Sequence, residues 1–226
     1  MPQKEQLKFS QINIGSGYDY KDNFINVDVD PACKPDILII DNDDSEILRN
    51  HYELVYAKDV LEHISRDNTL QTLLNWSDYL KIGGILNVET SDIEGIIDIM
   101  REDSSFANQY GMTICMFGNQ KHPGDFHYTG FTQKTLSVFL KAAGFDILSI
   151  ETKDRWLINA TAKKVHDWSF FDNKENIVDY AFKTALGRLP DPYHYIYFND
   201  KPEKEILFSI WSSKERLFKS AIDNDL

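Results

Sequence analysis

The sequence predicts an α/β protein with a mostly parallel sheet, an antiparallel hairpin at the sheet edge and a small C-terminal helical appendage. Three observations carry this prediction. Short apolar runs alternate with helix-patterned segments through about residue 150. A glycine turn, Gly15–Gly17, directly follows the first apolar run. After Lys163-Lys164 the strand-like runs stop and only helical patterns remain.

The bulk composition excludes several classes of partner. The 226 residues fit one medium domain with an appendage, and 42% hydrophobic with 27% charged residues is ordinary for a soluble protein. A net charge of −12 disfavours nucleic acid, since binding to its phosphates depends on Lys and Arg. No apolar run is long enough to span a membrane, and the first ten residues lack an apolar signal core. With two distant cysteines, Cys33 and Cys115, expected to be free, we predict a cytoplasmic protein.

Short apolar runs bounded by turn residues are the candidate parallel strands. They are Ile12–Ile14, Phe24–Val27, Ile37–Ile40, Leu54–Ala57 and Ile85–Val88. Before the last of these, Ser65–Leu80 carries leucines at helical spacing, and Lys81–Gly84 is expected to end that helix. A strand, helix and strand of these lengths predict a right-handed crossover.

The next segments predict the sheet edge. Thr132–Ala143 has an amphipathic helical pattern, with Thr132 as its N-cap and Gly144 as its C-terminal stop. Phe145–Glu151 and Trp156–Ala162 are strand-like and are joined by a four-residue link. Such a short link predicts an antiparallel pair at the edge of the sheet.

The C-terminal part reads as helices only. Asp172–Leu186 and Glu203–Phe218 have helical patterns, and Gly187–Pro192 reads as a turn between them. We therefore predict a sheet domain over residues 1–165 and a helical appendage over residues 166–226.

Six motifs follow one another along the chain: Ile12-Asn13-Ile14-Gly15-Ser16-Gly17, Asn26–Asp30, Asp36–Asp41, Glu53–Ile64, Leu80–Leu86 and His127–Phe145. Their order is the one found in class I S-adenosylmethionine (SAM)-dependent methyltransferases, and over residues 10–163 the chain resembles the compact bacterial branch of that family. The resemblance implies a Rossmann-like fold and S-adenosyl-L-methionine as cofactor. One departure is Ile82, which stands where the family usually has proline.

The resemblance also implies a set of cofactor-binding residues. The first motif would approach the methionyl part, Asp28 would hold the ribose hydroxyls, and Lys58 with Asp59 would flank the methionyl part. Asp41 or Asn42 would lie near the adenine amino group. The full predicted set is Ile14, Gly15, Ser16, Gly17, Asp28, Val29, Asp41, Asn42, Lys58 and Asp59.

The first crossover departs from the family pattern. Gly17 is followed by Tyr18-Asp19-Tyr20, so the third glycine is absent, and only ten residues separate Gly17 from Asp28. A helical crossover needs about a dozen residues or more, so the first helix is expected to be missing or reduced to a turn. The same facts make a nicotinamide-binding site a much weaker prediction than a SAM site, because a nicotinamide site needs the third glycine and a longer spacing to the acidic residue.

Two histidines are the predicted catalytic residues. His63 follows the fourth strand, where ligands bind in open α/β sheets, and His127 lies in a polar loop before the late helix. A neutral imidazole can take the proton of an acceptor hydroxyl, and His127 is the preferred base. The alternative is that each histidine only bonds its loop to the backbone. His122 and Asp125 with His127 suggest a metal site, but the resemblance disfavours metal and none is predicted.

The turn Leu186–Asp191 carries a Leu-Gly-Arg-x-Pro-Asp pattern and resembles a short repeat domain found beside bacterial carbohydrate-handling and surface proteins. The combined resemblances imply methyl transfer to a hydroxyl or amine of a small molecule, with a sugar or nucleotide-sugar of surface-polysaccharide biosynthesis as acceptor. The appendage is expected to serve as a docking or packing element. The alternative is a catalytically inactive binding or scaffold module with the methyltransferase fold.

Overall fold

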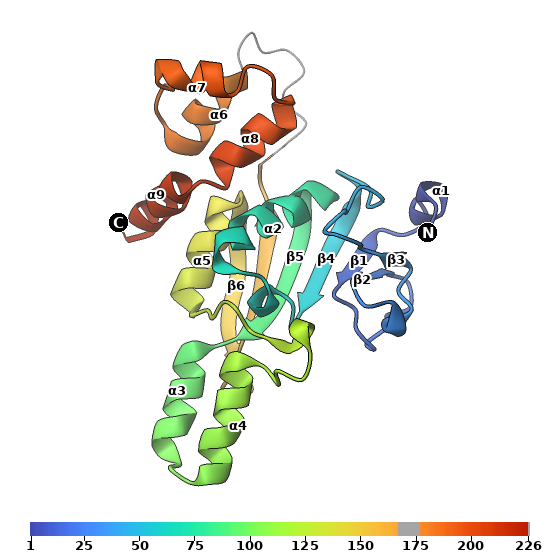
Figure 1. Cartoon of the computed structure of the whole chain (residues 1–226), viewed down its shortest axis with the longest axis vertical. Coiled ribbons are helices and arrows are strands. Elements are labelled where there is room, and N and C mark those ends of the chain that lie inside the picture. The colour runs from blue at the N-terminus through green and yellow to red at the C-terminus, as the bar shows by residue number, and fades with distance from the viewer. Residues whose placement is uncertain (167–176, 226) are drawn as a thin grey trace.

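The computed structural model describes residues 1–166 and 177–225, and these contain a seven-stranded sheet in the order β3-β2-β1-β4-β5-β7-β6 (Figure 1). Neighbouring strands are parallel except for β7, which is antiparallel to both β5 and β6. This arrangement confirms the predicted mostly parallel sheet with an antiparallel edge. The strands are β1 (Gln11–Ile14), β2 (Ile25–Asp28), β3 (Ile37–Leu38), β4 (Tyr52–Lys58), β5 (Leu80–Ser91), β6 (Phe145–Lys153) and β7 (Leu157–Lys164).

Apart from the one-turn helix α1 (Gln3–Gln6) near the N-terminus, the helices of the described residues lie on the sheet, in a protruding hairpin or in a C-terminal cluster (Figure 1). The helices on the sheet are α2 (Arg66–Tyr79) and α5 (Gln133–Ala142), and short 3-10 turns occur at Pro31–Cys33, Leu61–His63 and Pro123–Asp125. The hairpin is α3 (Ile93–Glu102) and α4 (Phe106–Phe117). The C-terminal cluster is α6 (Ile177–Leu186), α7 (Pro192–Tyr197), α8 (Glu203–Trp211) and α9 (Lys214–Asp225).

The core lies between the sheet and helices α2 and α5. Alternate residues of β4 and β5 are fully buried against these helices, since successive side chains of a strand point to opposite faces. They include Val55, Ala57, Leu86 and Val88 from the sheet, with Leu73, Leu74, Leu136 and Leu140 from the helices. Their neighbours Leu54, Tyr56 and Asn87 are only half-buried, and within the described residues no helix packs extensively on their face of the sheet.

The uncovered face follows from the short first crossover. Residues 15–24 contain no helix, which confirms the prediction from the ten-residue spacing. Side-chain hydrogen bonds fix the loop instead. Asn13 Nδ2 donates to Asp19 O at 3.1 Å and to Asn26 Oδ1 at 3.0 Å, and Asn26 Oδ1 also accepts from the Lys21 N–H at 2.9 Å. Two buried amides thus replace the apolar contacts that a crossover helix would make.

Two predicted boundaries are wrong. Lys81–Gly84 does not separate helix from strand, because α2 ends at Tyr79 and β5 already begins at Leu80, which pairs with Tyr52. The third strand stops at Leu38 rather than Ile40, since left-handed backbone at Asp41 and Asn42 turns the chain.

The predicted ends of α5 are confirmed. Thr132 and Thr135 form a capping box at its N-terminus, and Gly144 follows its C-terminus with φ of +83°. The predicted helix over Glu203–Phe218 is wrong in its length, because a break at Ser212-Ser213 divides it into α8 and α9. The predicted helix over Asp172–Leu186 is present as α6 from Ile177, and residues 172–176 lie outside the described part.

The α3–α4 hairpin is absent from the sequence-based prediction. It follows β5 and projects away from the carboxyl end of the sheet in Figure 1. Asn108 and Gln109 of α4 donate to main-chain oxygens at the end of α3, which closes the hairpin. The sequence does carry a signal for α3, because Asp92 is an N-cap and Ile93, Ile96, Ile97 and Met100 follow it at helical spacing, and the prediction did not use this signal.

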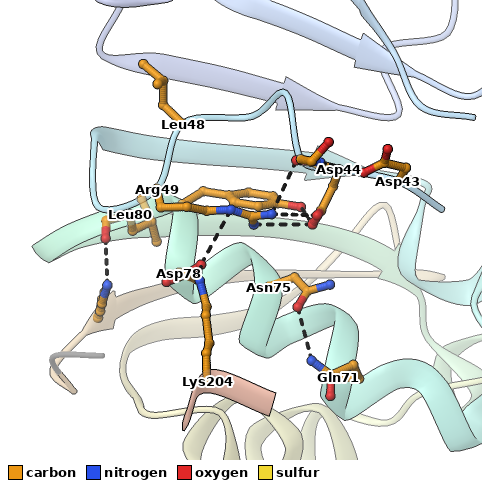
Figure 2. Close-up of polar contacts among 12 residues, drawn as sticks. Asp43, Asp44, Leu48, Arg49, Gln71, Asn75, Asp78, Leu80 and Lys204 are labelled. Carbon is orange, nitrogen blue, oxygen red and sulfur yellow. Dashed lines mark hydrogen bonds and ion pairs between the residues drawn. The ribbon is translucent and has the colours of Figure 1, made fainter. Parts of the chain in front are cut away.

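Ion pairs join the C-terminal helices to the amino ends of the strands (Figure 2). Lys204 of α8 pairs with the buried Asp78 at the end of α2, and Arg49 Nε lies 3.6 Å from the same carboxylate. Arg49 also donates to Asp44 Oδ1 at 2.5 Å. A shallow cavity of about 410 Å³ opens beside these groups, between α2 and α8. Since Arg49 precedes β4, this cavity lies at the end of the sheet opposite to the predicted site.

Candidate functional site

The turn after β1 is held by the carboxylate at the end of β2. Gly15 and Gly17 have φ of +62° and +51°, which glycine adopts at little cost. The Gly17 N–H donates to Asp28 Oδ2 at 2.7 Å, and the Asp30 N–H donates to Asp28 Oδ1 at 2.9 Å. Both oxygens keep a further lone pair, so Asp28 can still accept hydrogen bonds from a ligand diol.

The space around this turn fits a polar ligand. A Cβ placed on Gly17 would meet no atom within 4 Å, whereas one on Gly15 would lie 2.3 Å from Val60 Cγ2. Ser16 is 3% exposed, and its Oγ has no hydrogen-bond partner among residues 1–166 and 177–225. A buried hydroxyl without a partner is costly, so a ligand that bonds to it would relieve that cost.

Neither neighbouring tyrosine fills the turn. Tyr18 is 84% exposed, and the hydroxyl of Tyr20 donates to Asp36 Oδ1 at 2.8 Å. The Asp36 carboxylate also accepts from the Asn26 N–H, so this pair fastens the loop to β2. The glycine turn and Asp28 therefore stay accessible.

The predicted adenine-side residues lie next to the end of β2. The Ile39 N–H donates to Asp28 O at 2.9 Å, which places the residues after β2 and β3 side by side. Val29 and Ile40 are large apolar side chains exposed at this position, and Asp41 and Asn42 follow them. Exposed aliphatic groups beside polar ones suit an aromatic heterocycle.

The end of β4 carries a charged cluster that includes two residues absent from the sequence-based prediction. Lys58 Nζ lies 3.4 Å from Glu89 Oε1, and Lys153 Nζ donates to Glu89 Oε2 at 2.6 Å. The Glu89 carboxylate raises the pKa of Lys58, so this ammonium stays charged. Asp59 follows Lys58 with φ of +52°, and its N–H donates to Glu89 O at 3.0 Å.

The structure brings the two predicted catalytic histidines together. The rings of His63 and His127 meet edge to face with centroids 4.7 Å apart. His63 Nδ1 lies 3.1 Å from Phe126 O, and His127 Nδ1 lies 3.1 Å from Cys115 O. A carbonyl oxygen only accepts, so each Nδ1 carries the hydrogen and each Nε2 carries the lone pair in the neutral ring. Burial, assisted by His63, lowers the pKa of His127, which favours this neutral form.

Glu62 immediately precedes His63 in the sequence and is 1% exposed. Its carboxylate accepts from Thr90 Oγ1 at 2.9 Å and from Ser91 Oγ at 3.4 Å, at the end of β5. Burial raises the pKa of Glu62 to about 7. The main-chain oxygen of Glu62 accepts from the N–H groups of Tyr128 and Thr129, so this residue joins the two loops that carry the histidines.

His122 and His127 make separate contacts and do not face one another. His122 Nε2 lies 3.0 Å from Asp125 Oδ1 on the surface, whereas His127 faces His63 and Cys115. Across residues 1–166 and 177–225, no three His, Cys, Asp or Glu side chains gather as a metal would require. Cys33 and Cys115 are free and half-buried.

The comparisons with known proteins show the fold. No model of a known protein family matches the chain, and no curated protein matches it either. Among solved structures, the chain is similar to the trans-methyltransferase CalH in complex with SAH, with 16% identity and a TM-score of 0.50 over 72% of this chain and 53% of that one. A SAM-dependent methyltransferase from Mesorhizobium loti matches with 14% identity and a TM-score of 0.48, over 70% of this chain and 91% of that one.

A third neighbour is the 1,6-didemethyltoxoflavin-N1-methyltransferase of Burkholderia thailandensis, solved with 1,6-didemethyltoxoflavin and S-adenosylhomocysteine. It matches with 13% identity and a TM-score of 0.47, over 73% of this chain and 75% of that one. At 16% identity and a TM-score of 0.50, the likeness to CalH establishes the fold alone, a Rossmann-like methyltransferase fold. None of the helices in the described residues has the length and apolar character needed to cross a bilayer.

Sequence reasoning missed four residues of this site: Ile40, Glu62, Glu89 and Lys153. Glu89 carries a signal that could have been used, since it directly follows the apolar run Ile85–Val88 and therefore lies near the carboxyl end of a strand, where ligands bind in open sheets. Lys153 has no such signal, because it reaches Glu89 only through the pairing of β6 with β7.

Proposed function

We propose that this chain is a SAM-dependent methyltransferase. The observation that supports it most directly is the glycine turn held by Asp28, with the unpartnered Ser16 hydroxyl and open space beside Gly17. A carboxylate at the end of the second strand that keeps free lone pairs suits a ribose diol. The residues therefore fit the cofactor that the sequence motifs imply.

In this proposal each predicted residue has a place. The segment Ile14–Gly17 lies along the methionyl part, and Lys58 with Asp59 borders that part from β4. Asp28 holds the ribose, while Val29, with Asp41 or Asn42, borders the adenine. Exposed Ile40 joins the apolar side of the adenine position.

The chemistry assigned to the chain is proton removal and alignment. Bound at this turn, SAM would supply an electrophilic methyl group. His127 accepts the proton of the acceptor hydroxyl or amine at Nε2, because its Nδ1 hydrogen is committed to Cys115 O. The ring of His63 packs against His127 and fixes its orientation. Holding the acceptor in line with the methyl group supplies the rest of the acceleration.

The acceptor in this proposal is a sugar or nucleotide-sugar of bacterial surface-polysaccharide biosynthesis in the cytoplasm. It rests on the resemblance of Leu186–Asp191 to the repeat domain of carbohydrate-handling proteins, with a domain boundary near residue 165. In that turn, Arg188 donates two hydrogen bonds to Glu215 at 2.7 and 2.9 Å and lies 3.8 Å from Asp191. Exposed Tyr193 and Ile196 on α7 support the proposed docking role of the appendage.

Calorimetry with S-adenosylhomocysteine tests the cofactor site. We expect measurable binding by the wild-type chain and a loss of at least about 100-fold in affinity for Asp28→Ala, since two charge-assisted hydrogen bonds are removed. Asp22→Ala is the matched control, because Asp22 is an exposed carboxylate of the same loop. Equal affinities for the two variants, or no binding at millimolar ligand by the wild-type chain, would refute the proposal.

One observation favours the alternative of an inactive module. The missing crossover helix leaves the glycine turn open on one side, which weakens the exclusion of water from the site. Transfer of a labelled methyl group from SAM to a nucleotide-sugar or to glycans of a cell extract separates the two readings. Binding of S-adenosylhomocysteine without any transfer would favour the inactive module.

A further inference from the structure

The carboxyl ends of β4 and β5 and the amino end of the antiparallel β7 place three polar residues in one row on the uncovered face of the sheet. Lys58 is the direct partner of Glu89 in the β4–β5 register, and Glu89 is the direct partner of Asn159 in the β5–β7 register. Directly paired residues lie on the same face of a sheet. Lys153 reaches this row from β6 and donates to Glu89 Oε2 at 2.6 Å.

The charges of this row do not cancel. One carboxylate, with 4% of its side chain exposed, lies between two ammonium groups whose side chains are 41% and 47% exposed. Each ammonium has three donors and directs one of them towards Glu89. The two ammonium groups therefore keep several unused N–H donors, and the nearby carboxylate of Asp59, on which both lysines act electrostatically, offsets part of their charge.

Two acceptor oxygens in this row receive no hydrogen bond from the described residues. Glu89 Oε1 forms an ion pair with Lys58 but accepts no hydrogen bond from the described residues, and neither does Asn159 Oδ1. Both atoms are buried, and the groups that pair with Glu89 are the flexible ends of Lys58 and Lys153. Buried acceptors without donors indicate a cluster that a ligand completes.

We propose that Lys58 and Lys153 form a subsite for an anionic group of the methyl acceptor, a phosphate or a carboxylate. A hydroxyl or amine hydrogen beside that group would bond to Glu89 or Asn159. The placement of this subsite next to Asp59 rests on the proposed function, because Asp59 borders the methionyl position there. The anion itself is recognised by the two lysines whether or not methyl transfer occurs.

Titrations with inorganic phosphate and with acetate, followed by amide chemical shifts at low ionic strength, test the subsite. We expect residues around Glu89 to shift, and we expect Lys153→Met to weaken this binding at least tenfold. Lys163→Met is the matched control, because Lys163 is an exposed lysine at the opposite end of the same sheet. The tighter of the two probes distinguishes a phosphate ester from a carboxylate acceptor.

Equal binding of both probes by wild type and Lys153→Met, or an equal loss with Lys163→Met, would overturn the proposal. Affinity for S-adenosylhomocysteine separates it from the proposed function. We expect Lys153→Met to leave that affinity within twofold of wild type, and a parallel loss would reassign the cluster to the methionyl carboxylate. If the wild-type chain binds phosphate at Glu89 but no S-adenosylhomocysteine, the subsite stands while the proposed function fails.

Discussion

The buried carboxyl of Glu62 makes the stability of this protein depend on pH. Its pKa is raised to about 7 from an ordinary value of 4.5, mainly by burial, although Thr90 and Ser91 donate hydrogen bonds to it. Glu62→Gln removes the titration while keeping the shape and an acceptor oxygen. The change therefore isolates the free energy of ionising this side chain inside the fold.

The sign of the effect follows from the two pKa values. The folded pKa lies above the unfolded one, so between pH 4.5 and 7 the folded state binds more protons and stability falls as pH rises. A difference of about 2.5 pKa units corresponds to about 3 kcal/mol in total. Between pH 5.5 and 8.0 the expected loss is about 2 kcal/mol, because part of the unfolded-state titration is already complete at pH 5.5.

Urea denaturation of wild type and Glu62→Gln at both pH values measures this loss. We expect the free energy of unfolding of the variant, relative to wild type, to rise by about 2 kcal/mol from pH 5.5 to pH 8.0. The comparison cancels any effect of the substitution that is independent of pH. Glu53→Gln, at an exposed carboxylate of β4, is the matched control for removing a carboxylate at the surface of the same fold. A relative rise below about 1 kcal/mol for Glu62→Gln would refute the assigned burial.

Three other perturbations follow from the geometry. In urea denaturation, Gly15→Ala should lower the free energy of unfolding by about 3 kcal/mol, since its Cβ would lie 2.3 Å from Val60 Cγ2, whereas Gly17→Ala should lower it by only about 1 kcal/mol. Equal losses for the two variants would contradict this. His127→Gln should lower the methyl-transfer rate at least about 100-fold. In wild type the rate should fall on acidification with a midpoint below pH 6.5, because burial lowers the pKa of His127, and a midpoint above pH 7 would exclude this histidine as the base. Arg216→Ala should lower the free energy of unfolding by about 2 kcal/mol in thermal denaturation, since the guanidinium donates to main-chain oxygens at the ends of both α5 and α6. Arg216→Lys should be nearly as destabilising, and wild-type stability of the Lys variant would contradict this geometry.

The residues that local chemistry determines were predictable. Glycines at positive φ, a threonine N-cap and a carboxylate after an apolar run have the same meaning in any context, so the turn at Gly15–Gly17, Asp28 and the start of α5 follow from the sequence. The absent crossover helix also follows from the sequence, because ten residues are too few to cross back over a sheet.

Other elements depend on tertiary contacts. The apolar residues of α3 recur at helical spacing, but the pairing of α3 with α4 as a hairpin depends on contacts between the two helices and is not visible in either segment alone. The end of α2 is set by the pairing of Leu80 with Tyr52, which overrides the glycines that followed it. Local preferences are weak compared with a strand pairing of this length, so such boundaries cannot be read from one segment alone.

By itself the sequence determined the α/β class and the turn that supports Asp28, and it predicts a site at the carboxyl ends of the strands, because these depend on spacing and on backbone preferences of single residues. Only the tertiary structure decided that His63 and His127 touch, that the Glu62 side chain is buried against Thr90 and Ser91, and that Lys153 shares Glu89 with Lys58. These residues are up to 95 positions apart, counted from Lys58 to Lys153. Strand order and register bring them together, and both are set by the packing of the whole sheet.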